Sequence, residues 1–226
     1  AALASTAVAR DTSAEAHLEA LAQARPGVGL ILGRRAPTAG GRVVRLGRVA
    51  RRLLRALPGP VVIVPPDLDP ATLGDGPVIA TTDARDDSLP ACRFAVALAR
   101  ALGRSALLVH VVPTPDVWIH EAVMLPPEQV FGRLQAEGEA VLARWAQRHE
   151  LDALERFVDV GGVVHGVEAI AQARNAPLIV CGSRQLGAIP RFFAGSVASE
   201  LAASSRLPVA VIPHDYKDRR NAEAAS

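Results

Sequence analysis

From about residue 77 onward, the chain alternates between short apolar runs and longer segments with apolar residues every three or four positions. Phe94, Ala95, Leu98 and Leu102 share one helical face, for example, and Gly103 ends that pattern. The alternation predicts strands at residues 78–82, 106–112, 157–160, 178–181 and 209–212, and helices at residues 88–102, 127–149, 164–174 and 195–204. Strands that are apolar on both faces and alternate with helices indicate a parallel sheet covered on both sides. With right-handed crossovers, this predicts an α/β fold built on an open, doubly wound five-stranded parallel sheet sandwiched by helices.

The first part of the chain repeats the last part. Three segments match in the same order, each 148 or 149 residues before its counterpart: 30–35 with 178–184, 47–50 with 195–198, and 60–65 with 208–213. The first copy corresponds only to the back half of the five-stranded pattern. Two strands and two helices leave much apolar surface uncovered. We therefore expect either that the chain comes from inside a longer tandem protein, which is favoured, or that this half completes itself on another surface.

Prolines and glycines separate the two copies, among them Pro65, Pro66, Pro70, Gly74 and Gly76. The predicted organisation is a partial copy at residues 1–68, a linker at 69–76, a complete domain at 77–214 and a polar tail at 215–226.

Composition narrows the classes of function. A formal net charge of +2 and an aromatic content of 4% argue against nucleic acid and membrane surfaces as partners. The chain has no apolar run of the roughly 18–20 residues that a membrane span needs and no basic leader at its start, so we expect a cytoplasmic protein. Cys92 and Cys181 lie far apart in apolar segments, which favours buried free thiols in a reducing cytosol.

One glycine-containing segment carries candidate binding chemistry. Gly182 directly follows a predicted strand, and Gly195-Ser196 opens the next helix. Glycine lets the backbone approach a ligand closely, and the N–H groups at a helix start favour a phosphate. Ligands of parallel sheets bind at the carboxyl ends of strands, where Asp83 and Val111 also lie.

These segments resemble the universal stress protein family. Nucleotide-binding members carry Gly-x2-Gly-x9-Gly-Ser/Thr between the fourth strand and the fourth helix. The spacing from Gly182 to Gly195-Ser196 fits, but Gln185 stands where the second glycine belongs, with Gly187 two places later.

Two further elements support the resemblance. The family's acidic residue after the first strand matches Asp83, although Ala84 and Arg85 replace its usual Gly-Ser continuation. The family's His-Val ending of the second strand matches His110-Val111. The resemblance covers residues 75–213 and, more weakly, residues 14–66.

The resemblance implies an adenine-nucleotide α-hydrolase-like fold that binds ATP or another adenine nucleotide in the second domain, with Mg²⁺ only alongside the nucleotide. The implied binding residues are Thr82, Asp83, Val111, Gly182, Arg184, Gly195, Ser196 and Val197. Asp83 would hold the ribose or phosphate end, backbone groups of Val111 the adenine edge, and Arg184 would offset phosphate charge. Last strands of this family often pair across a dimer, so residues 60–65 and 208–213 could pair within one chain or between chains.

The expected function is that of a stress-response sensor or adaptor, with slow ATP hydrolysis at most. The alternative is a non-nucleotide-binding interaction protein with the same fold, motivated by Gln185 and Arg85. An enzyme such as an ATP pyrophosphatase comes third, because no phosphate loop follows the first strand. Asp83 and Gly195-Ser196 could also serve only as helix caps.

The remaining candidates are weaker. In the first copy Arg48 replaces the serine and the glycine spacing is one residue longer, so we expect no ATP there. An arginine stripe at residues 45, 48, 52 and 55 could be an anionic-partner surface, but a solvated helix face is favoured. His110 is expected to be structural or pocket-lining. The six histidines do not cluster, so no dedicated metal site is expected. No nucleophile–base set can be argued from spacing.

Overall fold

The computed structural model describes residues 13–24, 29–34, 46–56, 59–114, 127–183 and 196–216. Its strands are β1 (Leu30–Gly33), β2 (Val61–Val64), β3 (Val78–Thr81), β4 (Ala106–Pro113), β5 (Glu155–Gly161), β6 (Ile179–Ser183) and β7 (Val209–Pro213). Its helices are α1 (Ala14–Ala24), α2 (Arg48–Ala56), α3 (Leu89–Ala101), α5 (Pro127–Arg148), α6 (Val163–Ala173) and α7 (Val197–Ser204), with short 3₁₀ turns η1 (Pro70–Thr72) and η2 (Asp86–Ser88).

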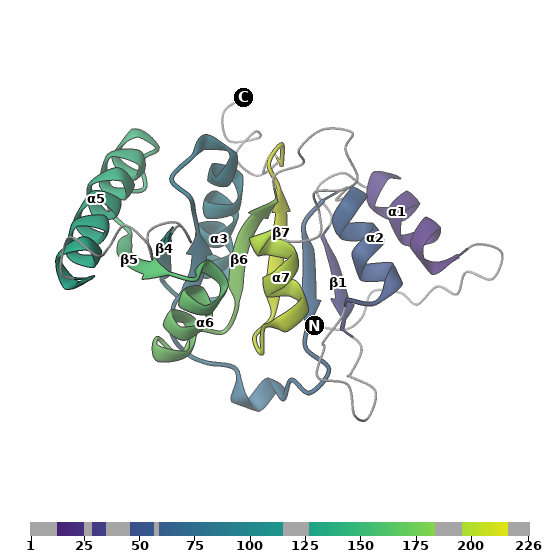
Figure 1. The fold of residues 1–226 in the computed structure, drawn as a ribbon. Helices are drawn as coiled ribbons and strands as arrows, with labels where there is room; N and C mark the ends of the chain where they lie inside the picture. Colours follow the sequence, from purple (N-terminus) through teal and green to yellow (C-terminus); the bar gives the residue numbers. More distant parts are fainter. Residues whose placement is uncertain are drawn as a thin grey trace.

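All seven strands belong to one sheet, in the order β1-β2-β7-β6-β3-β4-β5. Figure 1 shows them running across the molecule, from β5 near α5 to β1 near α1 and α2. The α/β class is confirmed, and each element predicted after residue 77 is present with its ends within two residues. The five-stranded count was wrong for the whole sheet. Strands β3 to β7 form the predicted parallel set, but β2 continues it through antiparallel pairing with β7.

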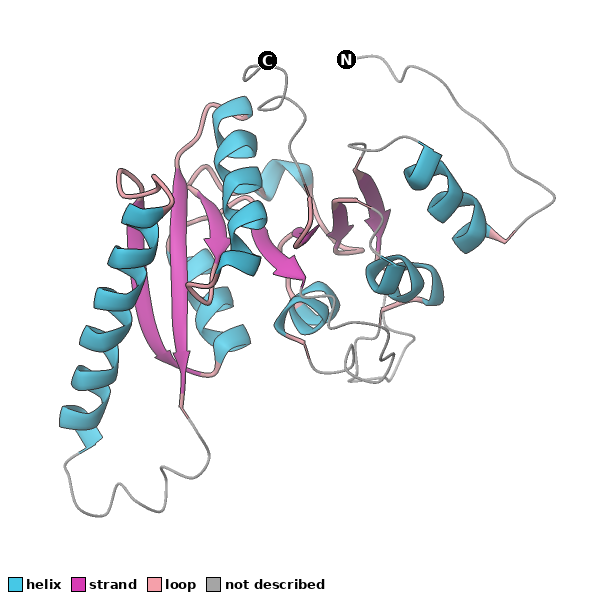
Figure 2. Cartoon of the chain, turned by 90° about the horizontal axis from the view of Figure 1, so that it is seen from above, coloured by secondary structure: helices cyan, strands magenta, loops and turns pink. Residues whose placement is uncertain are grey.

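Alternating side chains of the strands divide the core between two faces. Ile79 packs in a cluster with residues of α2, α6 and α7, whereas its neighbours Val78 and Ala80 pack with residues of α3 and α5. Figure 2 shows helices on both sides of the strands. Because successive side chains of a strand point to opposite faces, strands that are apolar at every position need this double cover.

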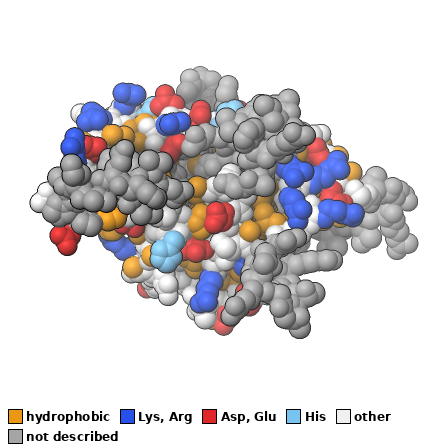
Figure 3. All heavy atoms as spheres, viewed as in Figure 1, with side chains coloured by type: hydrophobic (Ala, Val, Ile, Leu, Met, Phe, Trp, Pro, Cys, Tyr) orange, Lys and Arg blue, Asp and Glu red, His pale blue; other side chains and the backbone are white. Residues whose placement is uncertain are grey.

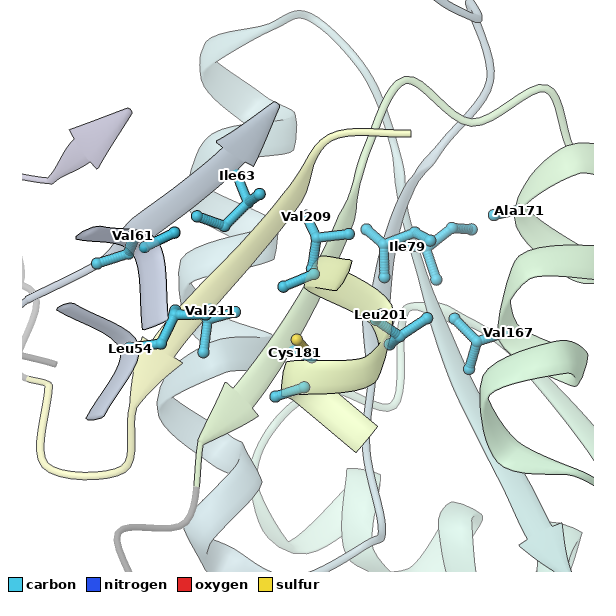
Figure 4. Packing of buried hydrophobic residues seen from close by; sticks show 14 of the residues in the cluster. Leu54, Val61, Ile63, Ile79, Val167, Ala171, Cys181, Leu201, Val209 and Val211 are labelled. Atoms are coloured by element: carbon cyan, nitrogen blue, oxygen red, sulfur yellow. The ribbon is translucent and has the colours of Figure 1, made fainter. Parts of the chain in front are cut away.

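The contact between β2 and β7 joins the two parts of the chain. Val62 lies opposite Ala210, with Val61 opposite Val211 and Ile63 opposite Val209. Figure 4 shows side chains from both strands packed in one cluster. The two segments that the sequence suggests as pairing partners thus lie antiparallel within one chain, and association between chains stays a prediction.

Arg34 adds a polar contact between the N-terminal segment and α7. It follows β1, is 9% exposed, and its Nη1 donates hydrogen bonds to the carbonyls of Ala203 (2.6 Å) and Ala202 (3.4 Å) in α7. A cation at the carboxyl end of a helix is favourable because the last carbonyls lack helical partners. The N-terminal segment therefore holds the far end of the helix whose first residues face the cavity described next.

Candidate functional site

A cavity of about 410 Å³ lies at the carboxyl ends of β3, β4 and β6. The starts of α6 and α7 and the turn η2 complete its walls. Strand β3 lies between β6 and β4 in the parallel part of the sheet. After β3 the next strands are added on one side of it, and β6 and β7 are added on the other, so the strand order reverses at this point. Such a switch point leaves a crevice in parallel sheets, because the crossovers on its two sides diverge. The fold itself therefore creates the cavity.

Most of the sequence-predicted binding residues that are described meet at this cavity. Those that line it are Thr82, Asp83, Val111, Gly182 and Val197. Ser196 immediately precedes α7 at its edge. Arg184 and Gly195, together with Gln185 and Gly187, lie outside the described residues. The cavity brings together predicted residues that are up to 115 positions apart in the chain, from Thr82 to Val197.

The turn after β3 is held by a network of side chains. Ser88 Oγ donates to the Arg85 carbonyl (2.7 Å), so the 2.6 Å contact between Ser88 and Thr82 has the Thr82 hydroxyl as donor. Thr82 Oγ1 in turn accepts from the Ala84 N–H (2.9 Å). Asp83 Oδ1 accepts from the Arg85 N–H (3.3 Å), which is an Asx turn and caps neither η2 nor α3. Thr82 thus shapes the turn, and its hydroxyl is already engaged.

Arg85 lies beside Asp83 in the cavity wall. Its Nε is 3.9 Å from Asp83 Oδ2, and its side chain is 69% exposed. An ion pair at this distance and exposure contributes little to stability. Arg85 can therefore move aside for a ligand without a large loss.

Ala84 has a strained backbone, with φ of 57°. Left-handed geometry costs a residue with a Cβ about 1–2 kcal/mol, whereas glycine adopts it freely. This is the position where the resembling family carries glycine. Ala84 therefore replaces the family's glycine but has a left-handed backbone, a conformation that glycine adopts freely.

We expect Ala84→Gly to stabilise the fold by about 0.5–1 kcal/mol, because the relieved strain outweighs the extra chain entropy that glycine loses. Ala97→Gly, in the exposed middle of α3, is the control and should cost about 1 kcal/mol. Urea denaturation of both variants measures the difference. Equal losses in the two variants would contradict left-handed geometry at Ala84.

Strand β4 contributes a histidine and backbone groups. His110 Nδ1 lies 2.9 Å from the Thr82 carbonyl, which can only accept, so Nδ1 carries the hydrogen. His110 is thus both pocket-lining and structural, as the sequence suggests. The Thr82 N–H donates to the Val109 carbonyl (2.9 Å), and β3 ends there. Because backbone groups alternate sides along a strand, those of Val111 point the same way, past the end of β3 toward the cavity.

Helix α7 presents its first turn to the cavity. Ser196 is its N-cap, and its Oγ accepts from the Ser199 N–H (3.2 Å). The capping role that the sequence allowed for Ser196 is confirmed. The N–H groups of Val197 and Ala198 belong to the first turn, where no helical acceptor exists, and both residues line the cavity.

Sequence reasoning missed several residues that line the cavity: Asp87, Ser88, Val163, Val167 and Cys181. Asp87 and Ser88 come from a turn whose path depends on Ala84. Val163 and Val167 are ordinary apolar residues of α6, and only the packing of that helix on β4 brings them here. Their four-residue spacing gives no signal beyond that of a helix with one buried face.

The two cysteines are free and buried, as the sequence predicts. Burial raises the pKa of the Cys181 thiol, and likewise that of Cys92, to about 12. A thiol with so high a pKa is a poor nucleophile at neutral pH because the thiolate is the reactive form. Cys181 therefore contributes apolar lining and no reactivity.

These shifts predict weakening of the fold at alkaline pH. Because the folded pKa lies above the ordinary value of 9.0, the stabilisation is complete below pH 9 and is lost as the pH rises toward 12. Each thiol should contribute up to about 1.4 kcal/mol per pH unit in that range. Urea unfolding at successive pH values tests this, with Cys92→Ala/Cys181→Ala as the control. Parallel pH profiles for the two proteins would contradict it.

A second cavity of about 440 Å³ lies at the corresponding place in the N-terminal segment. It is lined by residues at the end of β1 and the start of α2, and Glu15 of α1 reaches into it. Arg48 Nε donates to Glu15 Oε1 at 2.6 Å. The arginine that replaces the serine of the second copy is thus paired with a carboxylate. The expectation that ATP does not bind here stays a prediction.

Within the described part of the chain, histidines, cysteines and carboxylates form no group of three that could hold a metal ion. No helix there has both the length and the apolar character that a membrane crossing requires.

The model of the universal stress protein family matches residues 76–213, which cover the five parallel strands and the cavity. The chain belongs to the universal stress protein family. This family assignment covers the segment for which the sequence suggested it most strongly.

Universal stress proteins of mycobacteria resemble much of the chain. One from Mycolicibacterium smegmatis is 29% identical over 187 residues, covering 81% of this chain and 60% of the relative. One from Mycobacterium tuberculosis is 29% identical over 180 residues, covering 75% of this chain and 55% of the relative. The chain thus spans little more than half the length of these relatives.

Solved structures share the fold. A universal stress protein from Archaeoglobus fulgidus superimposes with a TM-score of 0.58 at 22% identity, over 88% of this chain and 66% of that one. A candidate universal stress protein from Pseudomonas aeruginosa superimposes with a TM-score of 0.64 at 15% identity, over 94% and 71%. Both likenesses extend well beyond residues 76–213 and therefore include part of the N-terminal segment.

Proposed function

We propose that this universal stress protein binds ATP or another adenine nucleotide in the cavity between β3, β4, β6 and α7. Nucleotide occupancy would make it a sensor or adaptor that responds to stress through a protein partner. One observation carries the proposal. Residues chosen from the sequence as nucleotide ligands line a single cavity at the switch point of the sheet.

The chemistry of the cavity supports this ligand class. A volume of about 410 Å³ lies within the usual range for small-molecule sites, roughly 300–1,000 Å³. The backbone groups of Val111 can pair with the edge of a base. The N–H groups of Val197 and Ala198 can bind phosphate oxygens at the positive end of α7. The apolar side chains of Val163 and Val167 offer a surface for the flat faces of the base.

The charges in the cavity bear on the role of Mg²⁺. Asp83 and Asp87 face the cavity together with Arg85, so its described lining carries one net negative charge at neutral pH. A bare polyphosphate would be repelled by these carboxylates. Because the described residues form no metal cluster of their own, Mg²⁺ would be bound together with the nucleotide. Asp83 is the side chain we expect to face it or the ribose.

Thermal-shift titrations with ATP, adenosine and tripolyphosphate, each with Mg²⁺, test the proposal. A ligand at 100 times its dissociation constant stabilises the fold by about 2.7 kcal/mol. We expect ATP to raise the melting temperature more than either fragment. Asp83→Asn, which keeps the acceptor for the Arg85 N–H and removes the charge, should reduce the shift without lowering the unliganded melting temperature. Equal shifts for ATP and tripolyphosphate would argue against an adenine site.

A second function is favoured by the Asp83–Arg85 contact. An arginine beside the acidic ligand is the feature expected of a cavity that has lost its nucleotide and kept its fold as an interaction platform. In that case ATP would produce no shift in the wild type, and Arg85→Ser would not restore one. A shift that appears only in Arg85→Ser would identify a nucleotide site blocked by this side chain. For either function we propose a cytoplasmic location, which the two buried free thiols support because they fit a reducing compartment.

We further propose that α1, β1, α2 and β2 form the back half of a second universal-stress-like unit. They follow the same order as α6, β6, α7 and β7, and both sets end in a parallel strand pair. The exposed face of β1 supports this equivalence. Ile31 is 74% exposed, far above every other large apolar residue of the described chain, whereas its counterpart Val180 is fully buried in the cluster around α3. The open edge of β1 would take a strand and a helix equivalent to β3 and α3.

Hydrogen exchange tests this equivalence. In an extended chain, a second copy of residues 75–150 is fused in front of Ala2, which is the position equivalent to Leu151. The added strand should pair with β1 and protect the amides of Ile31 and Gly33 from exchange. In the present chain these two amides should exchange rapidly, because β2 is the one described strand that pairs with β1. Unchanged exchange in the extended chain would refute the proposed equivalence.

A further inference from the structure

The exposed face of α2 is strongly basic. This helix buries Ala50, Leu53 and Leu54. Within about two turns it exposes four arginines, Arg48, Arg51, Arg52 and Arg55. These four arginines, which we call the arginine face, line a shallow hollow of about 560 Å³. Figure 3 shows basic side chains gathered over α2.

The sequence around this face is unusual in charge. Residues 20–66 contain nine arginines and no acidic residue. Because the whole chain has a formal net charge of +2, the remainder carries −7 (+2 less +9). Such asymmetry between two parts of a chain is typical of a surface that meets an anionic partner.

Helix α1 already occupies one flank of the arginine face. Glu15 Oε1 accepts from Arg48 Nε at 2.6 Å, and Glu19 Oε2 accepts from Arg52 Nε at 3.2 Å. The two carboxylates are four residues apart on one helix, and so are the two arginines on the other. A hydrogen bond from its own backbone N–H and the Arg48 guanidinium lower the pKa of the Glu15 carboxyl. Two arginines at this spacing thus bind a helix with two carboxylates at the same spacing.

The other flank repeats the four-residue spacing. Arg51 and Arg55 are four residues apart, and around the helix both lie on the other side of Arg48 from Arg52, although Arg55 neighbours Arg52 at a three-residue spacing. Arg51 Nη2 donates to the Leu46 carbonyl (3.0 Å), and within the described chain neither arginine pairs with a carboxylate. We propose that the Arg51–Arg55 flank is a docking surface for an acidic helix of a protein partner, one that carries carboxylates four residues apart.

The geometry favours an acidic helix over a nucleic acid. The four arginines span one helix of nine residues, and seven residues of rise cover only about 10 Å. Arg51 and Arg55, which pair with no carboxylate of the described chain, match two carboxylates at the same four-residue spacing on a partner helix. Neither α1 nor α2 contains a phenylalanine, tyrosine or tryptophan on which a base could stack.

The test uses the whole chain and a fluorescent alanine-based helical peptide that carries glutamates four residues apart. A second peptide of the same composition has its glutamates two residues apart, so that they face different sides of the helix. We expect salt-sensitive binding of the first peptide, measured by fluorescence anisotropy at low ionic strength, and clearly weaker binding of the second. Arg51→Gln/Arg55→Gln should weaken the first peptide roughly fivefold to tenfold. The control Arg93→Gln/Arg100→Gln, which removes two exposed arginines from α3, should change it less than twofold.

Several outcomes would overturn the proposal. Equal affinity for the two peptides would show general charge attraction, and absence of binding at millimolar peptide would exclude the surface. Double-stranded DNA or anionic lipid vesicles that bind more tightly than the first peptide, and lose affinity in Arg51→Gln/Arg55→Gln, would assign the arginine face to another class of partner. Circular dichroism of each variant checks that α2 stays folded.

Discussion

Replacing Gly76 with alanine is expected to destabilise the protein by about 3 kcal/mol, at the upper end of the usual cost of overpacking. A Cβ at this position would lie 1.9 Å from the Arg174 carbonyl oxygen and 2.7 Å from that of Asn175. Both are backbone atoms, which cannot turn away as a flexible side chain would. The Gly76 N–H also donates to the Asn175 carbonyl at 2.8 Å, so a shift that relieves the clash would break this bond.

The surroundings of Gly76 explain why relaxation would be costly. Asn175 has φ of 50°, and its Nδ2 donates to Asp75 Oδ1 at 2.7 Å. The turn between α6 and β6 is therefore fastened to the segment that leads into β3. Moving either partner would displace a central strand and the cavity at its far end.

Gly132→Ala is the matched control for this substitution. A Cβ there meets nothing within 4 Å, and the position is exposed on α5, so alanine should stabilise the helix by up to about 1 kcal/mol. Urea denaturation of the two variants gives the comparison. A loss below about 1 kcal/mol for Gly76→Ala would contradict the close packing of Gly76 against Arg174 and Asn175.

Removing residues 1–68 is expected to turn the protein into a dimer. The truncation exposes the edge of β7 that now pairs with β2, and open apolar edges recruit another strand. In the intact chain Val62 faces Ala210, its counterpart in the repeat, and the flanking pairs are arranged symmetrically around this one. A second β7 can therefore replace β2 in the same register, with Ala210 facing Ala210 of the other copy.

Light scattering measures the mass of the truncated chain, and a disulfide tests the register. Ala210→Cys should link two truncated chains, because facing residues of antiparallel strands lie at about 4.5–5.5 Å between Cα atoms, within the range of a disulfide. In the full chain Val62 occupies the facing position, so the same substitution should give no cross-link. A monomeric truncated chain that is still folded would refute the prediction.

The pattern of the sequence was enough to predict the elements of the second part of the chain. Each buried strand is a continuous apolar run, and helix α3 shows its buried face directly in Ala91, Ala95 and Ala99. The same pattern could not predict that β1 and β2 extend this sheet to seven strands. Whether β2 joins β7 depends on which strand edges are left open, and that is a property of the assembled sheet.

The residues of the candidate site also fall into a group that could be predicted from the sequence and a group that could not. Asp83, Val111 and Gly182 could be chosen in advance because they follow or end predicted strands. Ser88 and Val167 could not, since they reach the cavity only through the path of a turn and the packing of a helix. The left-handed conformation of Ala84 was not predicted, because an alanine in the sequence gives no sign of it.

The most direct test of the central claim is isothermal titration calorimetry of the intact chain with Mg·ATP. We expect one ATP to bind per chain. The heat should disappear in Val163→Trp, where a larger side chain at a partly exposed position of the lining fills the cavity. The control Leu102→Trp, at a half-exposed position beyond the end of α3, should bind as the wild type does. No heat in the wild type at millimolar ATP, or equal binding in Val163→Trp, would contradict a nucleotide site in this cavity.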